Sequence, residues 1–126
     1  MRTLAVTTAL TAFALLSATG CAETAETMDK ARTCIEAPKA ISETLDRVRR
    51  VVNDPDAMRE EISAGITKLR DLADKAADTT LREALQGLTD RLERIQVSDV
   101  QQAAKAAAQV AKDTAEYLNK IREACL

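Results

Sequence analysis

Small and apolar residues recur every three or four positions through most of the chain, in four runs separated by short polar breaks. This spacing is typical of amphipathic α-helices that pack nearly parallel or antiparallel to one another. No strand-like alternation of β-branched residues occurs, so the pattern predicts an all-α domain. The four runs are Ile41, Leu45, Val48, Val52; Met58, Ile62, Gly65, Leu69, Leu72, Ala76; Leu81, Leu85, Leu88, Leu92, Ile95; and Val100, Ala104, Ala107, Ala111, Thr114, Leu118, Ile121, Cys125.

The polar breaks predict where the helices start. Asp54 is the expected N-cap of the second helix, with Pro55 at the first helical position, where a missing N–H costs nothing. Thr80-x-x-Glu83 and Ser98-x-x-Gln101 have the form of capping boxes and predict the starts of the third and fourth helices. The predicted helices cover about 34–53, 55–77, 81–96 and 99–124.

Four helices joined by short turns predict an antiparallel up-down-up-down four-helix bundle over residues 31–126. The start of the first helix stays open, because Thr33-x-x-Glu36 has the form of a further capping box and Pro38 follows it closely. That helix either begins at Pro38 or kinks there. Gly65 is interpreted as a close approach between two helices, and otherwise as a tolerated defect of about 1 kcal/mol.

The first 20 residues differ from the rest of the chain. Met1 and Arg2 put positive charge at the start, and Leu4–Ala18 carries no charged residue. That apolar run is too short for a bilayer core, which needs about 20 residues. With the small residues that follow, it is typical of a secretory signal peptide. We therefore expect the chain to be exported and residues 1–20 to be removed.

Ala18-Thr19-Gly20-Cys21 resembles the lipobox of bacterial lipoprotein precursors, and the resemblance covers residues 1–21 only. It implies cleavage before Cys21 and a lipid on the Cys21 sulfur, which would hold the protein on the outer face of the cytoplasmic membrane. Ala18 stands where leucine is commoner in that family. Cleavage by the ordinary signal peptidase is the alternative and would leave a secreted, non-lipidated protein. The polar residues 21–30 are expected to form a flexible tether.

The two remaining cysteines, Cys34 and Cys125, are expected to form a disulfide. An exported chain reaches a space where disulfides persist, and three cysteines would leave an odd thiol there unless Cys21 carries a lipid. An up-down bundle of four helices brings the start of the first helix and the end of the fourth to the same end. Two unpaired or intermolecular thiols are the alternative.

Composition excludes several classes of function. Histidine and tryptophan are absent, so no histidine-based catalytic triad and no ordinary zinc site can form. The carboxylates show no calcium-loop spacing. Without residues 1–20 the chain carries 17 basic and 20 acidic residues, a net charge of −3, which provides no basic field for nucleic acid. We expect no enzyme activity, cofactor, metal or nucleic-acid partner.

Arg47, Arg49 and Arg50 form the sharpest basic cluster of the sequence. They are a candidate surface contact for anionic lipid head groups or a wall polymer, and a solvated helix end is the simpler interpretation. Tyr117 is interpreted as boundary packing. Export, an anchor and a bundle without catalytic residues favour a small monomeric lipoprotein of the bacterial envelope. It would act by contact with another envelope protein or with the wall.

Two other functions stay open. A helical bundle can carry an apolar ligand in its interior, although the alanine-rich fourth run draws helices together. An oligomeric rod is the second alternative, because a lipobox joined to an alanine-rich helix resembles the major murein lipoprotein. Tyr117-x-x-Lys120 is similar to the C-terminal end of that family. The present chain ends Ala124-Cys125-Leu126 instead of at a lysine, and its helix stops disfavour a rod.

Overall fold

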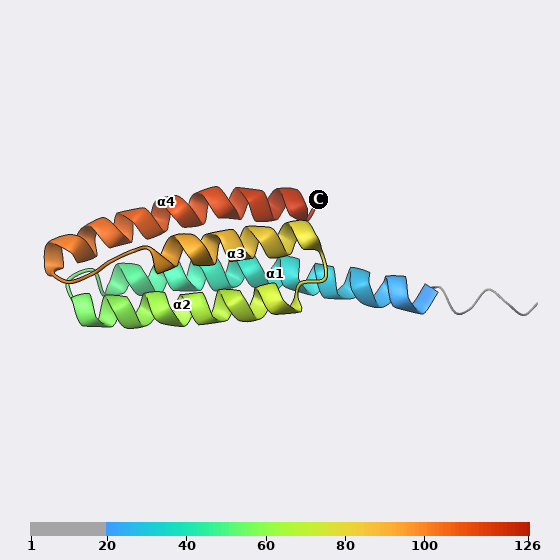
Figure 1. Cartoon of the computed structure of the whole chain (residues 1–126), viewed down its shortest axis with the longest axis horizontal. Helices are drawn as coiled ribbons and strands as arrows, with labels where there is room; N and C mark the ends of the chain where they lie inside the picture. The colour runs from blue at the N-terminus through green and yellow to red at the C-terminus, as the bar shows by residue number, and fades with distance from the viewer. Residues whose placement is uncertain (1–19) are drawn as a thin grey trace, which may run out of the picture.

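The computed structural model of the chain describes residues 20–126, which form four α-helices without a strand (Figure 1). Each helix packs on its two neighbours around a closed ring, and neighbouring helices run in opposite directions. The predicted antiparallel four-helix bundle is therefore confirmed. The predicted signal peptide lies outside the described residues. The helices are α1 (Gly20–Arg50), α2 (Pro55–Lys75), α3 (Thr79–Glu93) and α4 (Val100–Ala124).

Helix α1 starts earlier than the sequence predicts. It begins at Gly20 instead of near residue 34, so the expected tether over 21–30 is helical, and α1 projects beyond the other helices (Figure 1). The physical reason is composition, since residues 21–37 contain no glycine or proline to stop a helix. Pro38 lies inside α1 and neither starts nor ends it. Its missing N–H removes one backbone bond, the bond to the carbonyl of Cys34.

Aspartates cap the other three helices. Asp54 accepts a hydrogen bond from the N–H of Ala57 and precedes Pro55, as predicted. The two capping boxes are wrong, because Asp78 and Asp99 occupy the N-cap positions instead. A carboxylate caps as well as a hydroxyl and also complements the helix dipole. The Oγ of Ser98 donates to the side-chain oxygen of Gln102, one residue beyond the predicted partner.

The largest fully buried side chains of the core are apolar, with one exception. The largest fully buried side chains are Ile41, Met58, Leu69, Leu72, Leu81, Leu85, Leu88, Leu92, Ile121, Val48, Val110 and Asp113. The buried carboxylate of Asp113 lies on α4 and is the exception. Three of the four predicted apolar faces supply this core directly.

The predicted buried face of α4 is wrong over its first half. Val100 is 52% exposed and Ala104 is exposed, whereas the buried positions there are Ala103, Ala106 and Val110. Alanines occur on both registers, so small side chains alone do not decide which face turns inward. The larger side chains of Val110 and Tyr117 fit only the observed register, since Tyr117 is 8% exposed.

Two glycines allow close contacts between helices. A Cβ on Gly65 of α2 would lie 2.5 Å from Cγ2 of Thr44 on α1, which confirms the predicted close approach. A Cβ on Gly87 of α3 would lie 2.6 Å from Cε1 of Tyr117 on α4. Real Cβ contacts are not that short, so a side chain at either glycine would force Thr44 or Tyr117 to shift.

Candidate functional site

Helix α3 is much shorter than the helix that it packs against. It has 15 residues and α4 has 25, a difference of about 15 Å at 1.5 Å per residue. The segment 94–99 covers this difference as a connection that continues in the direction of α3 to the end of the bundle, where α4 begins (Figure 1). The first half of α4 therefore lies beside a loop and not beside a helix.

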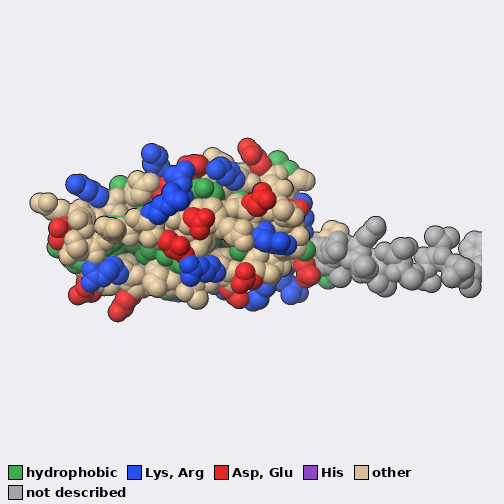
Figure 2. All heavy atoms as spheres, viewed as in Figure 1, with side chains coloured by type: hydrophobic (Ala, Val, Ile, Leu, Met, Phe, Trp, Pro, Cys, Tyr) green, Lys and Arg blue, Asp and Glu red, His purple; other side chains and the backbone are tan. Residues whose placement is uncertain are grey.

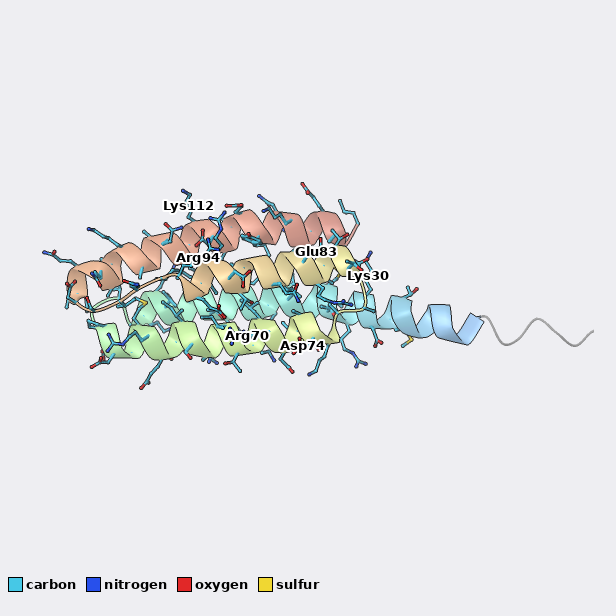
Figure 3. All side chains as sticks on the ribbon, viewed as in Figure 1. Lys30, Arg70, Asp74, Glu83, Arg94 and Lys112 are labelled. Atoms are coloured by element: carbon cyan, nitrogen blue, oxygen red, sulfur yellow. A yellow bond between two sulfur atoms is a disulfide. The ribbon has the colours of Figure 1, made fainter. Side chains whose placement is uncertain are left out.

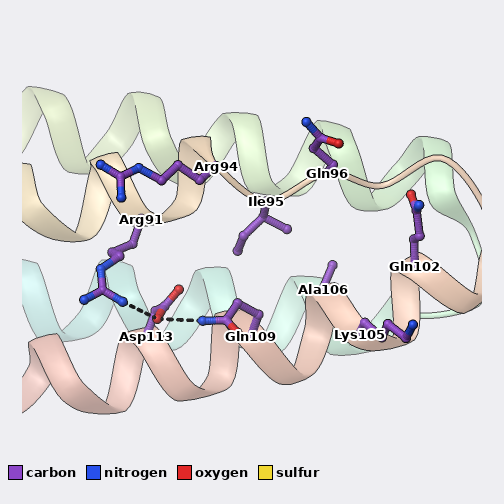
Figure 4. Close-up of a pocket in the computed structure, with 9 residues that line it drawn as sticks. All are labelled: Arg91, Arg94, Ile95, Gln96, Gln102, Lys105, Ala106, Gln109 and Asp113. Carbon is purple, nitrogen blue, oxygen red and sulfur yellow. Dashed lines mark hydrogen bonds and ion pairs between the residues drawn. The ribbon is translucent and has the colours of Figure 1, made fainter.

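A groove of about 510 Å³ opens where the loop replaces the helix. Helix α3 contributes one lining residue, the loop three and α4 five (Figure 4). Figure 2 shows basic and acidic side chains side by side over α3 and α4 on the face that it views. The lining residues are Arg91, Arg94, Ile95, Gln96, Gln102, Lys105, Ala106, Gln109 and Asp113.

The buried carboxylate of Asp113 organises one wall of this groove. Asp113 is 1% exposed, and its Oδ1 accepts a hydrogen bond of 2.9 Å from Nε2 of Gln109. The same oxygen lies 3.7 Å from a guanidinium nitrogen of Arg91, which reaches across from α3 (Figure 4). A buried carboxylate needs such partners to offset its desolvation. Asp113 therefore holds the side chains of Arg91 and Gln109 in place at the groove.

The other two cations of the groove have no acidic partner within residues 27–126. Arg94 follows the end of α3, and Lys105 lies in the second turn of α4. Neither makes an ion pair in that range, whereas Arg70 on α2 is paired with Glu93. Three positive charges therefore surround one carboxylate that is already bonded, and the solvent-facing wall of the groove is positively charged.

The predicted disulfide joins the first and last helices. Cys34 and Cys125 are bonded, with 5.8 Å between their Cα atoms. The bond closes a separation of 91 residues and lies at the end of the bundle from which α1 projects (Figure 1).

Cys21 lies in the first turn of α1, and its side chain is outside the described part of the structure. About 20 Å of helix separates the Cα atoms of Cys21 and Cys34.

An ion pair ties the projecting part of α1 to the bundle. Nζ of Lys30 lies 3.2 Å from Oδ2 of Asp78, at the turn between α2 and α3 (Figure 3). Asp78 also accepts the N–H of Leu81 at 2.9 Å. That backbone bond first, and Lys30 second, lower the pKa of Asp78 below its ordinary value because both favour the carboxylate. The contact fixes the base of the projecting helix.

The predicted cluster of Arg47, Arg49 and Arg50 does not line the basic groove. All three are exposed in the last turn of α1, where cations complement the helix dipole. Arg47 lies 4.0 Å from Glu61 of α2 and lines a smaller groove of mixed charge between these helices. The candidate surface contact of the sequence therefore lies at the end of α1, whereas the larger groove lies between α3 and α4.

Comparison with known families covers nearly all of the bundle. Residues 28–126 match a family described as a domain of unknown function, DUF8711. The chain belongs to the DUF8711 family. No curated protein and no solved structure matches it. The DUF8711 region contains the disulfide and the whole basic groove, and it begins at Met28, after the predicted lipobox.

The DUF8711 sequence contained one signal for the groove that sequence reasoning missed. Asp113 follows Val110 by three residues and precedes Tyr117 by four, so it continues the buried face of α4. A charged residue on an apolar face is a candidate for a functional or positioning role. Because the predicted apolar face of α4 ran through Ala111 and Thr114, it did not include Asp113.

Two further properties concern residues 20–126 of the DUF8711 chain. No helix in this range has the length and apolar character needed to cross a membrane. Among residues 27–126, whose side chains the structure describes, acidic and cysteine side chains do not gather into a group able to hold a metal ion.

Proposed function

We propose that this DUF8711 protein is a small, non-catalytic lipoprotein of the bacterial cell envelope, anchored through Cys21. It acts as a monomer by contact with a wall polymer or another envelope protein. The observation that carries the proposal is the Cys34–Cys125 disulfide, at the end of the bundle from which the helix bearing Cys21 projects.

A disulfide between the first and last helices favours an oxidising compartment, because cytosolic thiols are kept reduced. This agrees with the resemblance of residues 1–21 to an exported lipoprotein precursor. Lipidation would also account for the third cysteine, because a lipid on Cys21 leaves the exported chain without a free thiol.

The position of Cys21 supports anchoring at one end of the bundle. A lipid there would place the disulfide end about 20 Å along α1 from the point of attachment. Lys105 lies about 30 Å farther along α4 from Cys125. The basic groove would then face away from the membrane, where wall polymers and other envelope proteins are reached.

Carriage of an apolar ligand has less support. The side chains between the four helices include nine large aliphatic residues that are under 2% exposed and packed against one another. Close contacts at Gly65 and Gly87 bring the helices together. Residues 20–126 also fold back on themselves, which differs from a continuous helical rod.

Metabolic labelling tests the proposal. The full chain, expressed in a bacterial host with its own first 20 residues, is expected to incorporate a clickable palmitate analogue and to fractionate with membranes. Cys21→Ser is expected to lose both, while Cys34→Ser is a matched control that keeps the label. A wild-type chain that is cleaved, secreted and unlabelled would contradict the anchor.

A further inference from the structure

The strongest unassigned feature of the molecule is the positive charge of the groove between α3 and α4. The whole chain has a net charge of −2. The groove nevertheless brings three cations together, Arg91, Arg94 and Lys105, and its only carboxylate belongs to Asp113. Because Asp113 is buried and already bonded, an anion entering the groove would meet cationic side chains and no exposed carboxylate.

Ordinary helix stability explains part of this charge but not all of it. Cations at the end of α3 complement its dipole, which accounts for Arg91 and Arg94. Lys105 lies toward the N-terminal end of α4, where a cation gains nothing from the dipole. The residues three and four positions away from Lys105 are Gln101, Gln102, Ala108 and Gln109, so no intrahelical ion pair forms either.

Arg91 is already oriented for binding an oxyanion. Its contact with the buried Asp113 involves one guanidinium nitrogen at 3.7 Å, which leaves other N–H donors for a ligand. A guanidinium presents its donors as a planar fork that matches phosphate and carboxylate oxygens. Orienting the side chain before binding reduces the entropy lost on binding.

The remaining lining is suited to a hydroxyl-rich carrier of that anion. The Oε1 atom of Gln102 accepts hydrogen bonds from Ser98, so its amide N–H groups stay available. Nε2 of Gln109 donates to Asp113, so its amide oxygen stays available. Gln96 adds a third amide, and Ile95 and Ala106 provide a small apolar surface. The volume of about 510 Å³ falls within the range of small-molecule sites, about 300–1,000 Å³.

We propose that the α3–α4 groove binds an oxyanion, phosphate or carboxylate, carried on a sugar unit of a cell-wall polymer. The proposal rests on the envelope location proposed above. Arg91, Arg94 and Lys105 bind the oxyanion, and Gln96, Gln102 and Gln109 bind hydroxyl groups of the sugar. Asp113 is a positioning residue, since it acts through Arg91 and Gln109.

Binding is tested by NMR titration of the full-length protein in detergent micelles. The probes are glucose 1-phosphate, glucuronate, inorganic phosphate and glucose. Saturable shifts are expected at the side-chain amides of Gln96, Gln102 and Gln109 with at least one charged sugar, and these shifts weaken as salt rises. The charged sugar that binds more tightly identifies the oxyanion. Glucose is expected to cause no saturable shift, and inorganic phosphate is expected to bind more weakly than the preferred sugar.

Matched variants locate the site. The double variant R94Q/K105Q is expected to bind the preferred sugar at least tenfold more weakly, a loss of about 1.4 kcal/mol or more. R49Q/R50Q removes the same charge from the end of α1 and is expected to bind as the wild type does. No saturable shift with either charged sugar, or an equal loss in both double variants, would overturn the proposal.

The same samples separate this inference from the proposed function. R94Q/K105Q is expected to keep the palmitate label and the membrane location while it loses the sugar. Cys21→Ser is expected to lose the label while its groove still binds. A labelled, membrane-bound wild type without sugar binding would overturn the groove proposal alone.

Discussion

Gly87 and Tyr117 face each other across the α3–α4 interface with no room for a side chain on the glycine. A Cβ there would lie 2.6 Å from Cε1 and 2.9 Å from the hydroxyl oxygen of Tyr117. Tyr117 is 8% exposed, and Nζ of Lys120 lies 4.3 Å from its ring centroid. The only aromatic residue of the bundle therefore packs between helices, in agreement with the packing role predicted for it.

Gly87→Ala is expected to destabilise the bundle by about 1–3 kcal/mol, the usual cost of overpacking a core. Without the clash, the same change in a helix would stabilise by up to about 1 kcal/mol, so the sign of the effect is diagnostic. The measurement is urea unfolding followed by circular dichroism. Gln86→Ala, at an exposed neighbouring position, is the control and is expected to change stability by less than about 0.5 kcal/mol.

A double-mutant cycle tests the partner in this contact. Adding Gly87→Ala to Tyr117→Leu is expected to cost less than adding it to the wild type, because the ring that clashes has been removed. An equal cost in both backgrounds would show that Tyr117 is not what excludes the side chain.

Asp113→Ala is expected to destabilise the protein by about 1–3 kcal/mol, because it removes a hydrogen bond and an ion pair of a charged group and leaves the buried space of the side chain unfilled. Asp113→Asn keeps an oxygen for Gln109 and is expected to cost less. The measurement is again urea unfolding, with Lys112→Ala on the exposed side of α4 as the control. If Asp113→Ala proves as stable as the wild type, the carboxylate does not hold these side chains.

Reduction of the Cys34–Cys125 bond is expected to lower stability by about 4–5 kcal/mol, because the bond closes a loop of 91 residues. The same loss is expected for the double variant Cys34→Ser/Cys125→Ser without reductant. Comparison of urea midpoints with and without a phosphine reductant measures it. Cys21→Ser serves as the matched control, with the reductant effect retained in full. A reductant effect below 1 kcal/mol would show that the disulfide contributes little.

The lowered pKa of Asp78 predicts a loss of stability in acid. In the unfolded chain Asp78 takes up a proton at its ordinary pKa, whereas in the folded chain it does so only at a lower pH. The stabilisation by Asp78 is therefore fully present above the ordinary pKa. It is lost as the pH falls through the folded pKa. Asp78→Asn keeps a capping side chain and is expected to make the unfolding free energy less steeply dependent on pH below about 4.

Lys30→Gln separates the contribution of Lys30 to the lowered pKa of Asp78 from that of the Leu81 backbone N–H. It removes the smaller contribution and leaves the Leu81 N–H, so the acid dependence is expected to decrease only partly. Unfolding free energies measured in urea from neutral pH down to the acid limit of folding provide the comparison. If the unfolding free energy of Asp78→Asn depends on pH as steeply as that of the wild type, Asp78 does not cause the loss of stability in acid.

The sequence predicted the parts of the fold that strong local signals determine. Asp54-Pro55 marks one helix start by backbone chemistry, and the even pair of cysteines marks which chain ends meet. Gly65 on an apolar face marked a close helix contact. In each case a single residue type restricts the local structure strongly.

The buried face of α4, the path of α1 through Pro38 and the end of α3 could not be predicted, because local sequence favours no single structure there. Alanines lie on two faces of α4, so the sequence does not determine which face is buried. The contact of Tyr117 with Gly87 fixes the observed face. Pro38 is tolerated inside a helix that packing and the Cys34 bond support, although local rules predict that the helix begins or kinks there. The groove arises because α3 ends at Glu93, three residues before the predicted end, so that residues 94–99 form a loop beside α4; helix ends are the least certain part of a sequence-based assignment.

Intact-mass spectrometry of the protein purified from its own membrane, without reductant, examines the lipid anchor and the disulfide in one sample. We expect a chain that begins at Cys21, carries the mass of a lipid there and lacks the two hydrogens removed by one disulfide. Peptide mapping of the same sample should link Cys34 to Cys125. A chain that begins elsewhere, carries no lipid and has free thiols at Cys34 and Cys125 would contradict it.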